Sequence, residues 1–372
     1  MKRVLAVFGT RPEAIKMGPV VEALGRVPGI ETRTLATAQH RHLLDDVLRV
    51  FGIVPDHDLD VMTENQALAE VLSRCVLGID RILADEKPNL VLAQGDTTTV
   101  LATGLAAYFR RTPFGHVEAG LRTSDKYAPF PEELNRRLVG SLADVHFAPT
   151  PEAAENLLRE GTPQSAVHVT GNTVVDAVQA IAARTAGQTV IPPDVERFLQ
   201  GANRMILVTA HRRESFGAPL DSICLALRDL VTRYRDLVLV YPVHPNPNVR
   251  RAVDAHLRGE DRILLIDPVD YLQCVDLMRR STLILTDSGG IQEEAPSLRK
   301  PVLVLREKTE RPEGIRAGVA RLVGTDRERI VHEASRLLDS TAEYDRMVAA
   351  ENPYGDGQAA RRITDIVREL LN

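Results

Sequence analysis

The sequence predicts an α/β protein made of two Rossmann-like, doubly wound domains with a cleft between them. Three observations lead to this prediction. Short runs of β-branched and aliphatic residues recur along all 372 residues, and segments with the period of a helix lie between them. A stretch between Arg184 and Asn203 is rich in glycine and proline but has no strand pattern, so it separates two series of strands. Strands that alternate with helices form βαβ units and mainly parallel sheets.

Six expected strands precede this break and six follow it. The first six are Val4–Phe8, Thr32–Thr37, Leu90–Ala93, Phe114–Val117, Val145–Pro149 and Val167–Thr170. The second six are Met205–Thr209, Leu237–Tyr241, Ile263–Ile266, Leu283–Thr286, Val302–Leu305 and Arg321–Val323. Helices are expected between them, for example over Gln66–Asp85 and Leu220–Tyr234, where apolar residues recur at helical spacing. A last helix is expected at Gln358–Leu371.

Twelve strands are too many for one doubly wound sheet of common size. A (β/α)8 barrel is the alternative, and the strand-free break argues against it. We therefore expect an N-terminal domain over residues 1–170 and a C-terminal domain over residues 171–357.

The composition excludes several classes of protein. Hydrophobic residues make up 44% and charged residues 26%, which is typical of a globular domain and not of a disordered chain. The net charge of −5 and the absence of tryptophan argue against nucleic acid or an anionic membrane as the main partner. No apolar stretch approaches the ~18 residues of a membrane span. Cys75, Cys224 and Cys274 lie far apart, which predicts free thiols in a reducing compartment, so we expect a cytoplasmic protein.

Polar segments follow the ends of the expected strands in both halves of the chain. Ligands of doubly wound folds bind outside the carboxyl ends of the strands, so these segments are expected to face the cleft. They are Gly9–Glu13, Gln94–Thr99, Glu118–Arg122, Ala210–Glu214, Pro242–Pro247, Asp287–Glu294 and Thr309–Glu313.

The clearest candidate for an anion site is the segment from Asp287 to Gly290 that opens a helix. Its two glycines would let the backbone turn and approach a ligand, and a helix N-terminus offers free N–H donors. A plain strand-to-helix turn is the other interpretation. Glu294, one helical turn further, could accept hydrogen bonds from ribose hydroxyls or be a surface carboxylate. Six cationic side chains would attract an anionic substrate to the same cleft, most simply a diphosphate. For each of them taken singly, a surface ion pair is the alternative. They are Arg11, Lys16, Arg136, Arg212, Arg213 and Arg311.

Three carboxylates are candidate acid–base groups: Asp96, Glu118 and Glu132. Carboxylates in a partly closed site can move protons near neutral pH. Asp96 could equally cap a helix over Thr97–Arg110, and Glu132 could be a first-turn acid that favours its helix. Glu118 ends a buried strand and therefore needs a partner, for which Arg122 is the candidate.

Histidines offer a further candidate group. His211 lies at a strand end beside two arginines, a position from which a histidine could protonate a phosphate leaving group. A structural role is the alternative for His211, and also for His244. The sequence has no HExxH, EF-hand, Walker A or GxGxxG motif, so neither a metal nor a nicotinamide cofactor is indicated, and we expect no cofactor.

Together these motifs resemble the bacterial non-hydrolysing UDP-N-acetylglucosamine 2-epimerases over nearly the whole chain. The segments that match are Gly9–Glu13, Gly95–Thr99, His116–Thr123, Pro131–Glu133 with Asn135 and Arg136, His211–Glu214, Asp287–Pro296 and Thr309–Glu313. The resemblance implies a GT-B fold, a homodimer and the interconversion of UDP-GlcNAc and UDP-ManNAc. It also implies that the C-terminal helix, residues 358–372, packs back on the N-terminal domain.

The resemblance further implies a mechanism, in which UDP is eliminated to give 2-acetamidoglucal and is then added again with a new proton at C2. The implied catalytic residues are Asp96, Glu118, Glu132 and His211, and which carboxylate is base or acid stays open. The implied substrate- and UDP-binding residues are Arg11, Lys16, Arg136, Arg212, His244, Cys274, Ser288, Gly289, Gly290, Glu294 and Arg311.

Two departures from the family pattern matter. Cys274 stands where relatives can carry an aromatic residue against the uracil, so base stacking is expected to be weaker or supplied elsewhere. Some relatives are activated by UDP-GlcNAc at a second site. Gln39 and Glu132 match that pattern, whereas His42 and Asn65 do not, so an allosteric site at Gln39, His42 and Glu132 is a hypothesis.

Three other functions remain open on the sequence. A hydrolysing relative would release UDP and free ManNAc. A GT-B glycosyltransferase would need an acceptor site, and no amphipathic membrane-docking stretch is evident for a lipid acceptor. A catalytically silent nucleotide-sugar-binding protein would have no need of the three carboxylates and His211.

Overall fold

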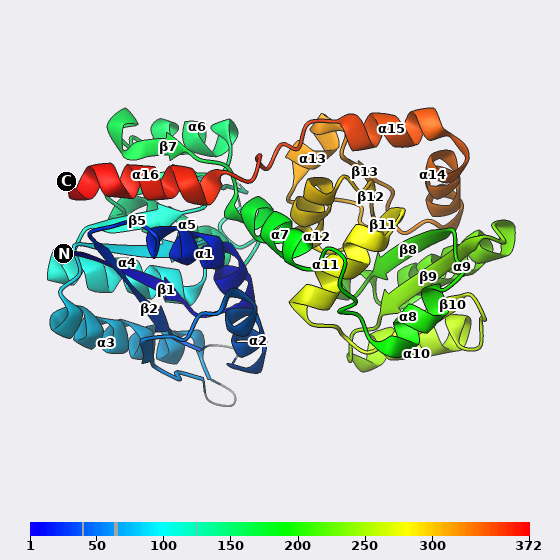
Figure 1. Cartoon of the computed structure of the whole chain (residues 1–372), viewed down its shortest axis with the longest axis horizontal. Coiled ribbons are helices and arrows are strands. Elements are labelled where there is room, and N and C mark those ends of the chain that lie inside the picture. Colours follow the sequence, from blue (N-terminus) through cyan, green and yellow to red (C-terminus); the bar gives the residue numbers. More distant parts are fainter. Residues whose placement is uncertain (39–40, 63–65, 124) are drawn as a thin grey trace. The chain divides into compact units, whose positions relative to one another are not determined.

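The computed structural model describes residues 1–38, 41–62, 66–123 and 125–372. The chain forms two compact units, one of Met1–Ala177 with Tyr354–Asn372 and the other of Val178–Pro353. Each unit holds one parallel β-sheet with helices packed on it (Figure 1). The fold is therefore the α/β class that the sequence predicts.

The limits of the two units differ slightly from those expected at residues 170 and 357. Unit 1 includes the start of helix α7 (Thr173–Arg184). Asp176 of this helix accepts hydrogen bonds from the backbone N–H groups of Ala359 and Ala360, at 3.2 and 2.9 Å. These bonds tie the start of α7 to the returning C-terminal segment, so both belong to unit 1.

The sheet of unit 1 has the strand order β3-β2-β1-β4-β5-β6-β7, and all of its strands are parallel. Its strands are β1 (Lys2–Phe8), β2 (Ile30–Ala36), β3 (His57–Asp58), β4 (Leu90–Gln94), β5 (Phe114–Val117), β6 (Val145–Ala148) and β7 (Val167–Val169). All six predicted strands are present within one or two residues of their predicted ends. The two-residue strand β3 was missed, because so short a strand has no alternating pattern.

Helices cover both faces of this sheet. They are α1 (Arg11–Leu24), α2 (Arg41–Phe51), α3 (Leu68–Glu86), α4 (Thr98–Arg110), α5 (Glu132–Leu142), α6 (Pro151–Arg159), α7 and α16 (Ala359–Leu371). The last helix, α16, packs against α1. Ile363, Val367 and Leu371 recur every four residues on its buried face, which is the spacing of one helix face.

The sheet of unit 2 has the order β10-β9-β8-β11-β12-β13 and is also parallel. Its strands are β8 (Arg204–Thr209), β9 (Leu237–Pro242), β10 (Ile263–Ile266), β11 (Leu283–Thr286), β12 (Val302–Val304) and β13 (Ala320–Leu322). Its helices are α8 (Pro193–Leu199), α9 (Ala218–Arg233), α10 (Pro247–Leu257), α11 (Tyr271–Arg280), α12 (Gly289–Glu294), α13 (Pro312–Ala317), α14 (Arg327–Asp339) and α15 (Thr341–Ala349). All six predicted strands of this half are present.

Two buried histidines in the sheet of unit 1 predict a loss of stability in mild acid. Burial lowers the pKa of His116 to about 3 and that of His146 to about 4. An unfolded histidine titrates near 6.5, so below that pH the unfolded chain binds more protons than the native one. The free energy of unfolding therefore falls as the pH drops from about 6.5 toward 4, by about 1.4 kcal/mol per pH unit for each histidine.

Urea unfolding at pH 7.5 and pH 5.0 measures this loss, which should be about 2 kcal/mol for each histidine at the lower pH. His146→Gln should remove about half of the difference. Equal stability at the two pH values would contradict the assignment.

Candidate functional site

Each sheet has one point at which the strand order reverses, and several of the predicted site residues follow the strands on either side of it. In unit 1 this switch point lies between β1 and β4, and in unit 2 it lies between β8 and β11. The loops that follow such neighbouring strands turn to opposite faces of the sheet and leave a crevice in which doubly wound proteins bind ligands. Each unit therefore presents one set of candidate residues.

In unit 1 the buried carboxylate of Glu13 joins the loops after β1 and β4. One of its oxygens accepts hydrogen bonds from the backbone N–H groups of Gly9 and Thr10, at 2.9 and 2.6 Å. The other accepts from the hydroxyl of Thr97 at 2.6 Å. Burial raises the pKa of Glu13 against the effect of these bonds. This carboxylate was not among the predicted site residues, although it ends the first matching motif.

Gly9 shows how tightly this loop is packed. A Cβ atom at this position would lie 2.2 Å from the hydroxyl of Thr37 and 2.3 Å from that of Thr99, so packing demands glycine. The loop holds Arg11 at the first turn of α1, where its side chain is partly exposed.

Glu118 lies directly after β5 and forms an ion pair with Lys16 of α1. Both side chains are about nine-tenths buried. The prediction that Arg122 is the partner of Glu118 was wrong. The Arg122 guanidinium instead donates two hydrogen bonds to the carboxylate of Glu160, at 2.8 and 2.6 Å. Glu118 has a left-handed φ of 64° and Gly120 one of 90°, so the chain turns sharply here and carries Arg122 toward the end of α6.

A second ion pair joins Asp96, after β4, to Arg136 of α5. The backbone carbonyl of Asp96 also accepts a hydrogen bond from the Asn135 side chain at 2.9 Å. Asp96 does not cap α4, so that alternative was wrong: Thr97 is the capping residue, and its hydroxyl accepts from the N–H of Val100. The Asp96 carboxylate faces a cation instead of a helix end.

Glu132 opens α5, as expected, and its side chain is partly exposed. The next residue, Glu133, is fully buried and was missed as a site residue. Its carboxylate accepts from the backbone N–H of Thr123 at 3.1 Å and lies 3.4 Å from the guanidinium of Arg136. Glu133 therefore holds the arginine that faces Asp96.

In unit 2 a buried carboxylate organises the loop after β8. One oxygen of Asp287 accepts hydrogen bonds from the backbone N–H groups of His211 and Arg212, at 2.5 and 2.7 Å. The other lies 3.3 Å from Nδ1 of His211. The ring of His244 stacks on that of His211, with centroids 5.3 Å apart and planes 8° apart. Burial, together with the neighbouring His211, lowers the pKa of His244.

The glycines that open α12 are not required by the fold. Neither Gly289 nor Gly290 has a positive φ, so the turn itself does not require glycine at these positions. An added Cβ on Gly289 would come no closer than 3.9 Å to the Arg212 side chain. One on Gly290 would lie 3.8 Å from the Ser288 hydroxyl and 3.9 Å from the Glu294 carboxylate. The glycines therefore leave room beside polar groups that the sequence predicts to bind UDP.

Arg311 packs on the same helix, where it forms an ion pair with the buried carboxylate of Glu293. Beside it, the hydroxyl of Thr309 donates to the Gln292 side chain at 2.6 Å. The segment that contains Arg311 is thus tied to α12. Cys274 lies on α11 and is partly exposed.

Part of the predicted second site cannot be described. Gln39 lies outside the described residues, as does Asn65, and His42 belongs to α2. The allosteric site stays a prediction.

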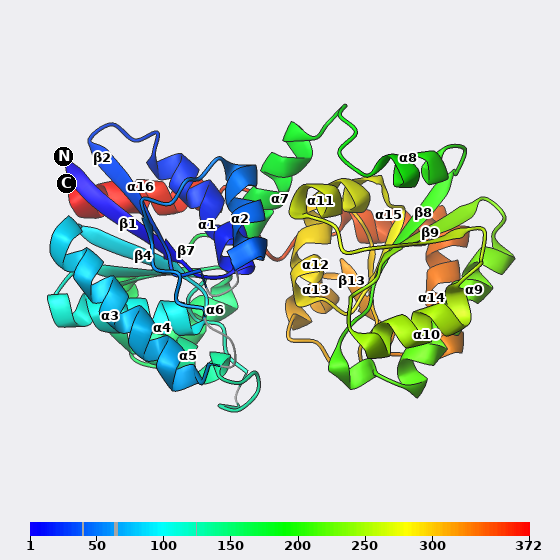
Figure 2. The same cartoon turned by 90° about the horizontal axis from the view of Figure 1, so that it is seen from below.

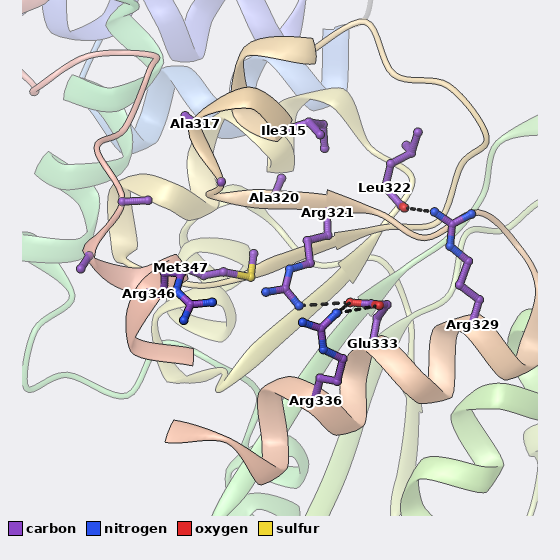
Figure 3. A pocket seen from close by; sticks show the side chains of 13 residues that line it. Ile315, Ala317, Ala320, Arg321, Leu322, Arg329, Glu333, Arg336, Arg346 and Met347 are labelled. Atoms are coloured by element: carbon purple, nitrogen blue, oxygen red, sulfur yellow. Dashed lines mark hydrogen bonds and ion pairs between the residues drawn. The ribbon is translucent and has the colours of Figure 1, made fainter. Parts of the chain in front are cut away.

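A cavity of about 900 Å³ lies elsewhere in unit 2, at the edge strand β13. Its lining comes from α13, β13, α14 and α15 and includes no predicted site residue among those described. Figure 3 shows the side chains of Arg321 and Arg336 gathered around Glu333. Glu343 also pairs with these two arginines, at 2.7 and 3.1 Å. Arg346 also pairs with Glu343, so three arginines share two carboxylates in a network that joins the edge strand to its helices.

In the part of the chain that the structure describes, no three His, Cys, Asp or Glu side chains come together in a way that could hold a metal ion. None of the helices described is both long enough and apolar enough to cross a membrane.

Two parallel sheets, each with charged side chains at its switch point, define a GT-B-like protein, the class of nucleotide-sugar epimerases and glycosyltransferases. The family model described as UDP-N-acetylglucosamine 2-epimerase matches residues 22–368. The chain belongs to this family, as the sequence motifs predicted.

The similarity to individual relatives extends over the whole chain. A UDP-N-acetylglucosamine 2-epimerase of Escherichia coli O157:H7 is 53% identical over 369 residues, which cover 98% of each chain. The crystal structure of a putative UDP-N-acetylglucosamine 2-epimerase from Listeria monocytogenes has a TM-score of 0.93 at 48% identity, over 100% of this chain and 97% of that one. The crystal structure of a UDP-GlcNAc 2-epimerase from Neisseria meningitidis bound to UDP-GlcNAc has a TM-score of 0.87 at 44% identity. The match covers 99% of this chain and 100% of that one.

Proposed function

We propose that this protein interconverts UDP-GlcNAc and UDP-ManNAc by reversible, non-hydrolysing epimerisation at C2. One observation carries the proposal. Two of the implied catalytic carboxylates, Asp96 and Glu118, each face a cation implied to bind the diphosphate, at the carboxyl end of one sheet. The pairs combine the two kinds of group that a proton transfer coupled to loss of a diphosphate requires.

The chemistry of the substrate explains why both kinds of group are needed. C2 of the sugar has no adjacent carbonyl, so its proton is not acidic. Elimination avoids this obstacle: a carboxylate takes the C2 proton, the C1–O bond breaks, and UDP leaves with both electrons of that bond. The product is 2-acetamidoglucal. Addition of UDP to C1, with a proton delivered to C2 from the opposite face, completes the inversion.

The roles of the side chains follow from this scheme. Asp96, Glu118 and Glu132 exchange the C2 proton, and His211 gives a proton to the leaving diphosphate. Ser288, Gly289 and Gly290 receive the phosphates, and Glu294 accepts from the ribose hydroxyls. His244 and Cys274 contribute to the UDP site, and five cations balance the charge of the diphosphate: Arg11, Lys16, Arg136, Arg212 and Arg311.

NMR of the purified protein with UDP-GlcNAc in D2O tests the proposal. We expect UDP-ManNAc to appear with deuterium at C2 and little net release of UDP. UDP and free ManNAc accumulating together would replace the proposal with the hydrolysing reaction. Ligand shifts without any turnover would indicate a nucleotide-sugar-binding protein.

We also propose that the protein is a homodimer that joins through helices α3, α4 and α5 of unit 1. These three helices lie next to one another (Figure 2). They expose large apolar side chains, between 45 and 67% accessible: Leu68, Leu77, Tyr108, Phe109, Leu134 and Leu138. Large apolar side chains exposed on neighbouring helices are typical of a surface that another protein covers.

Replacing both Leu77 and Tyr108 by glutamate should therefore yield a monomer, because two charges would lose their hydration in the interface. Light scattering coupled to size exclusion measures the mass. Val54→Glu, at a loop position that is 86% exposed, is the control and should remain a dimer. A monomeric wild-type protein would refute the proposal.

A further inference from the structure

The buried carboxylate of Asp287 lies beside the histidine that the proposed function assigns to the leaving diphosphate. We propose that Asp287 is a positioning residue: it fixes the His211 ring as the tautomer with the proton on Nδ1, so that Nε2 is left for the ligand. This inference rests on the proposed function for the identity of that ligand, but its structural part concerns the free protein.

Hydrogen bonds hold the Asp287 carboxylate beside His211. Asp287 is fully buried, and its backbone N–H donates to the carbonyl of Thr209 at 3.0 Å. The hydroxyls of Thr209 and Thr286 are 2.6 Å apart, which ties the ends of β8 and β11 together. One carboxylate oxygen already accepts from two consecutive backbone N–H groups, those of His211 and Arg212. Two hydrogen bonds to the carboxylate and one from the backbone N–H therefore hold Asp287 at this switch point.

The other carboxylate oxygen, Oδ1, faces His211. It is buried and has no hydrogen-bond partner among the described residues. A buried carboxylate oxygen requires a donor, because it has lost its water. Nδ1 of His211, 3.3 Å away, is the nitrogen that faces it. A proton on Nδ1 would face this oxygen at 3.3 Å, whereas the opposite tautomer would place two lone pairs against each other.

The His211 ring is covered on one face and partly exposed elsewhere. The His244 ring lies nearly parallel to that of His211, so His211 is covered on one face. The lowered pKa of His244 favours its neutral form, which limits repulsion when His211 is charged. The side chain of His211 is 39% exposed, so the ring is open to a ligand on its free side. The titratable groups against the ring are the Asp287 carboxylate and the His244 imidazole, and Arg212 is the next residue along the chain.

These contacts assign a direction to proton transfer. In the imidazolium form both nitrogens carry protons, and Nε2 gives its proton to a phosphate oxygen of UDP as the C1–O bond breaks. The ring returns to the neutral form with the Nδ1 proton held by Asp287. When UDP adds back, Nε2 recovers the proton, so the ring is unchanged after a full cycle.

Asp287→Asn tests this inference, because asparagine keeps an oxygen for the two backbone N–H groups. Its NH2 group would then face Nδ1 of His211 and favour the opposite tautomer. In 15N spectra of the labelled free protein at alkaline pH, we expect wild-type His211 to carry its proton on Nδ1 and the variant to carry it on Nε2. We expect kcat to fall about 100-fold or more, with the Kd for UDP changed less than about threefold.

Three comparisons separate positioning from a general structural role. In a His211→Gln background, Asp287→Asn should cause little further loss of kcat, because the two residues act as a unit. Asp221→Asn is the matched control: Asp221 pairs with His256 at 2.9 Å on the surface, and the variant should keep wild-type turnover. Wild-type His211 with its proton on Nε2, or additive losses in the double variant, would overturn the inference. A tautomer switch in a protein without turnover would support the positioning role and refute the proposed function alone.

Discussion

Asp96→Asn should lower kcat by about 10²–10⁴-fold while UDP still binds. Asparagine has nearly the shape of aspartate but cannot take or return a proton, and general acid–base catalysis contributes an effect of this size. The variant should fold, because Arg136 keeps Glu133 as a neighbouring carboxylate, 3.4 Å away. Initial rates of UDP-ManNAc formation and calorimetric titration with UDP measure the two quantities.

Glu118→Gln should lower kcat to a similar degree but also destabilise the protein. Its partner Lys16 is about nine-tenths buried, and removing one member of a buried ion pair costs about 3–5 kcal/mol. The double variant with Lys16→Met should therefore recover much of the stability but none of the turnover.

Glu160→Gln serves as the control for both variants, because this carboxylate pairs with Arg122 away from the switch point. It should retain wild-type kcat. Activity within threefold of wild type in Asp96→Asn and in Glu118→Gln would remove both carboxylates from the mechanism.

Gly290→Ala should weaken UDP binding by about 10- to 100-fold without a change in stability. The protein itself has room for the methyl group, whose nearest neighbours would be 3.8 and 3.9 Å away. The space it fills lies beside Ser288 and Glu294, where the proposed function places the nucleotide. A loss of about 1.4 kcal/mol of binding free energy lowers the affinity tenfold. The loss of one or two contacts to the phosphates therefore accounts for the expected range.

Calorimetric titration with UDP and thermal unfolding together measure this prediction. Gly120→Ala is the contrasting control: its Cβ would lie 2.1 Å from the carbonyl oxygen of Ala153, so this variant should fail to fold stably. Unchanged UDP affinity in a folded Gly290→Ala protein would place the phosphates elsewhere.

Several errors of the sequence analysis share a cause. Arg122 was paired with Glu118 because the two are near in sequence, but positive φ angles at Glu118 and Gly120 turn the chain between them. Lys16, the actual partner, lies 102 residues away. Asp96 was weighed as a helix cap, yet the cap is the next residue, Thr97. In each case the sequence shows the residue type, and only the folded chain shows its neighbour.

The strands and the polar segments that follow them could be predicted because they depend on local pattern. The apolar run Val4–Phe8 predicts a buried strand without any knowledge of its neighbours. The structure confirms this prediction, because all of these residues are fully buried. The motifs from Gly9 to Glu13 and from Asp287 to Glu294 were likewise evident from residue type and from their place after a strand. The family of the protein could be recognised from these same local motifs.

What the local pattern could not supply was which side chains meet and which atoms need a partner. The bond from Thr97 to Glu13 and those from two backbone N–H groups to Asp287 depend on the order of strands in each sheet. A buried carboxylate must find donors, and the donors within reach are decided by strands that are neighbours in space and far apart in sequence. The residue types of the site were therefore readable in the sequence, whereas its ion pairs and the orientation of His211 came from tertiary packing.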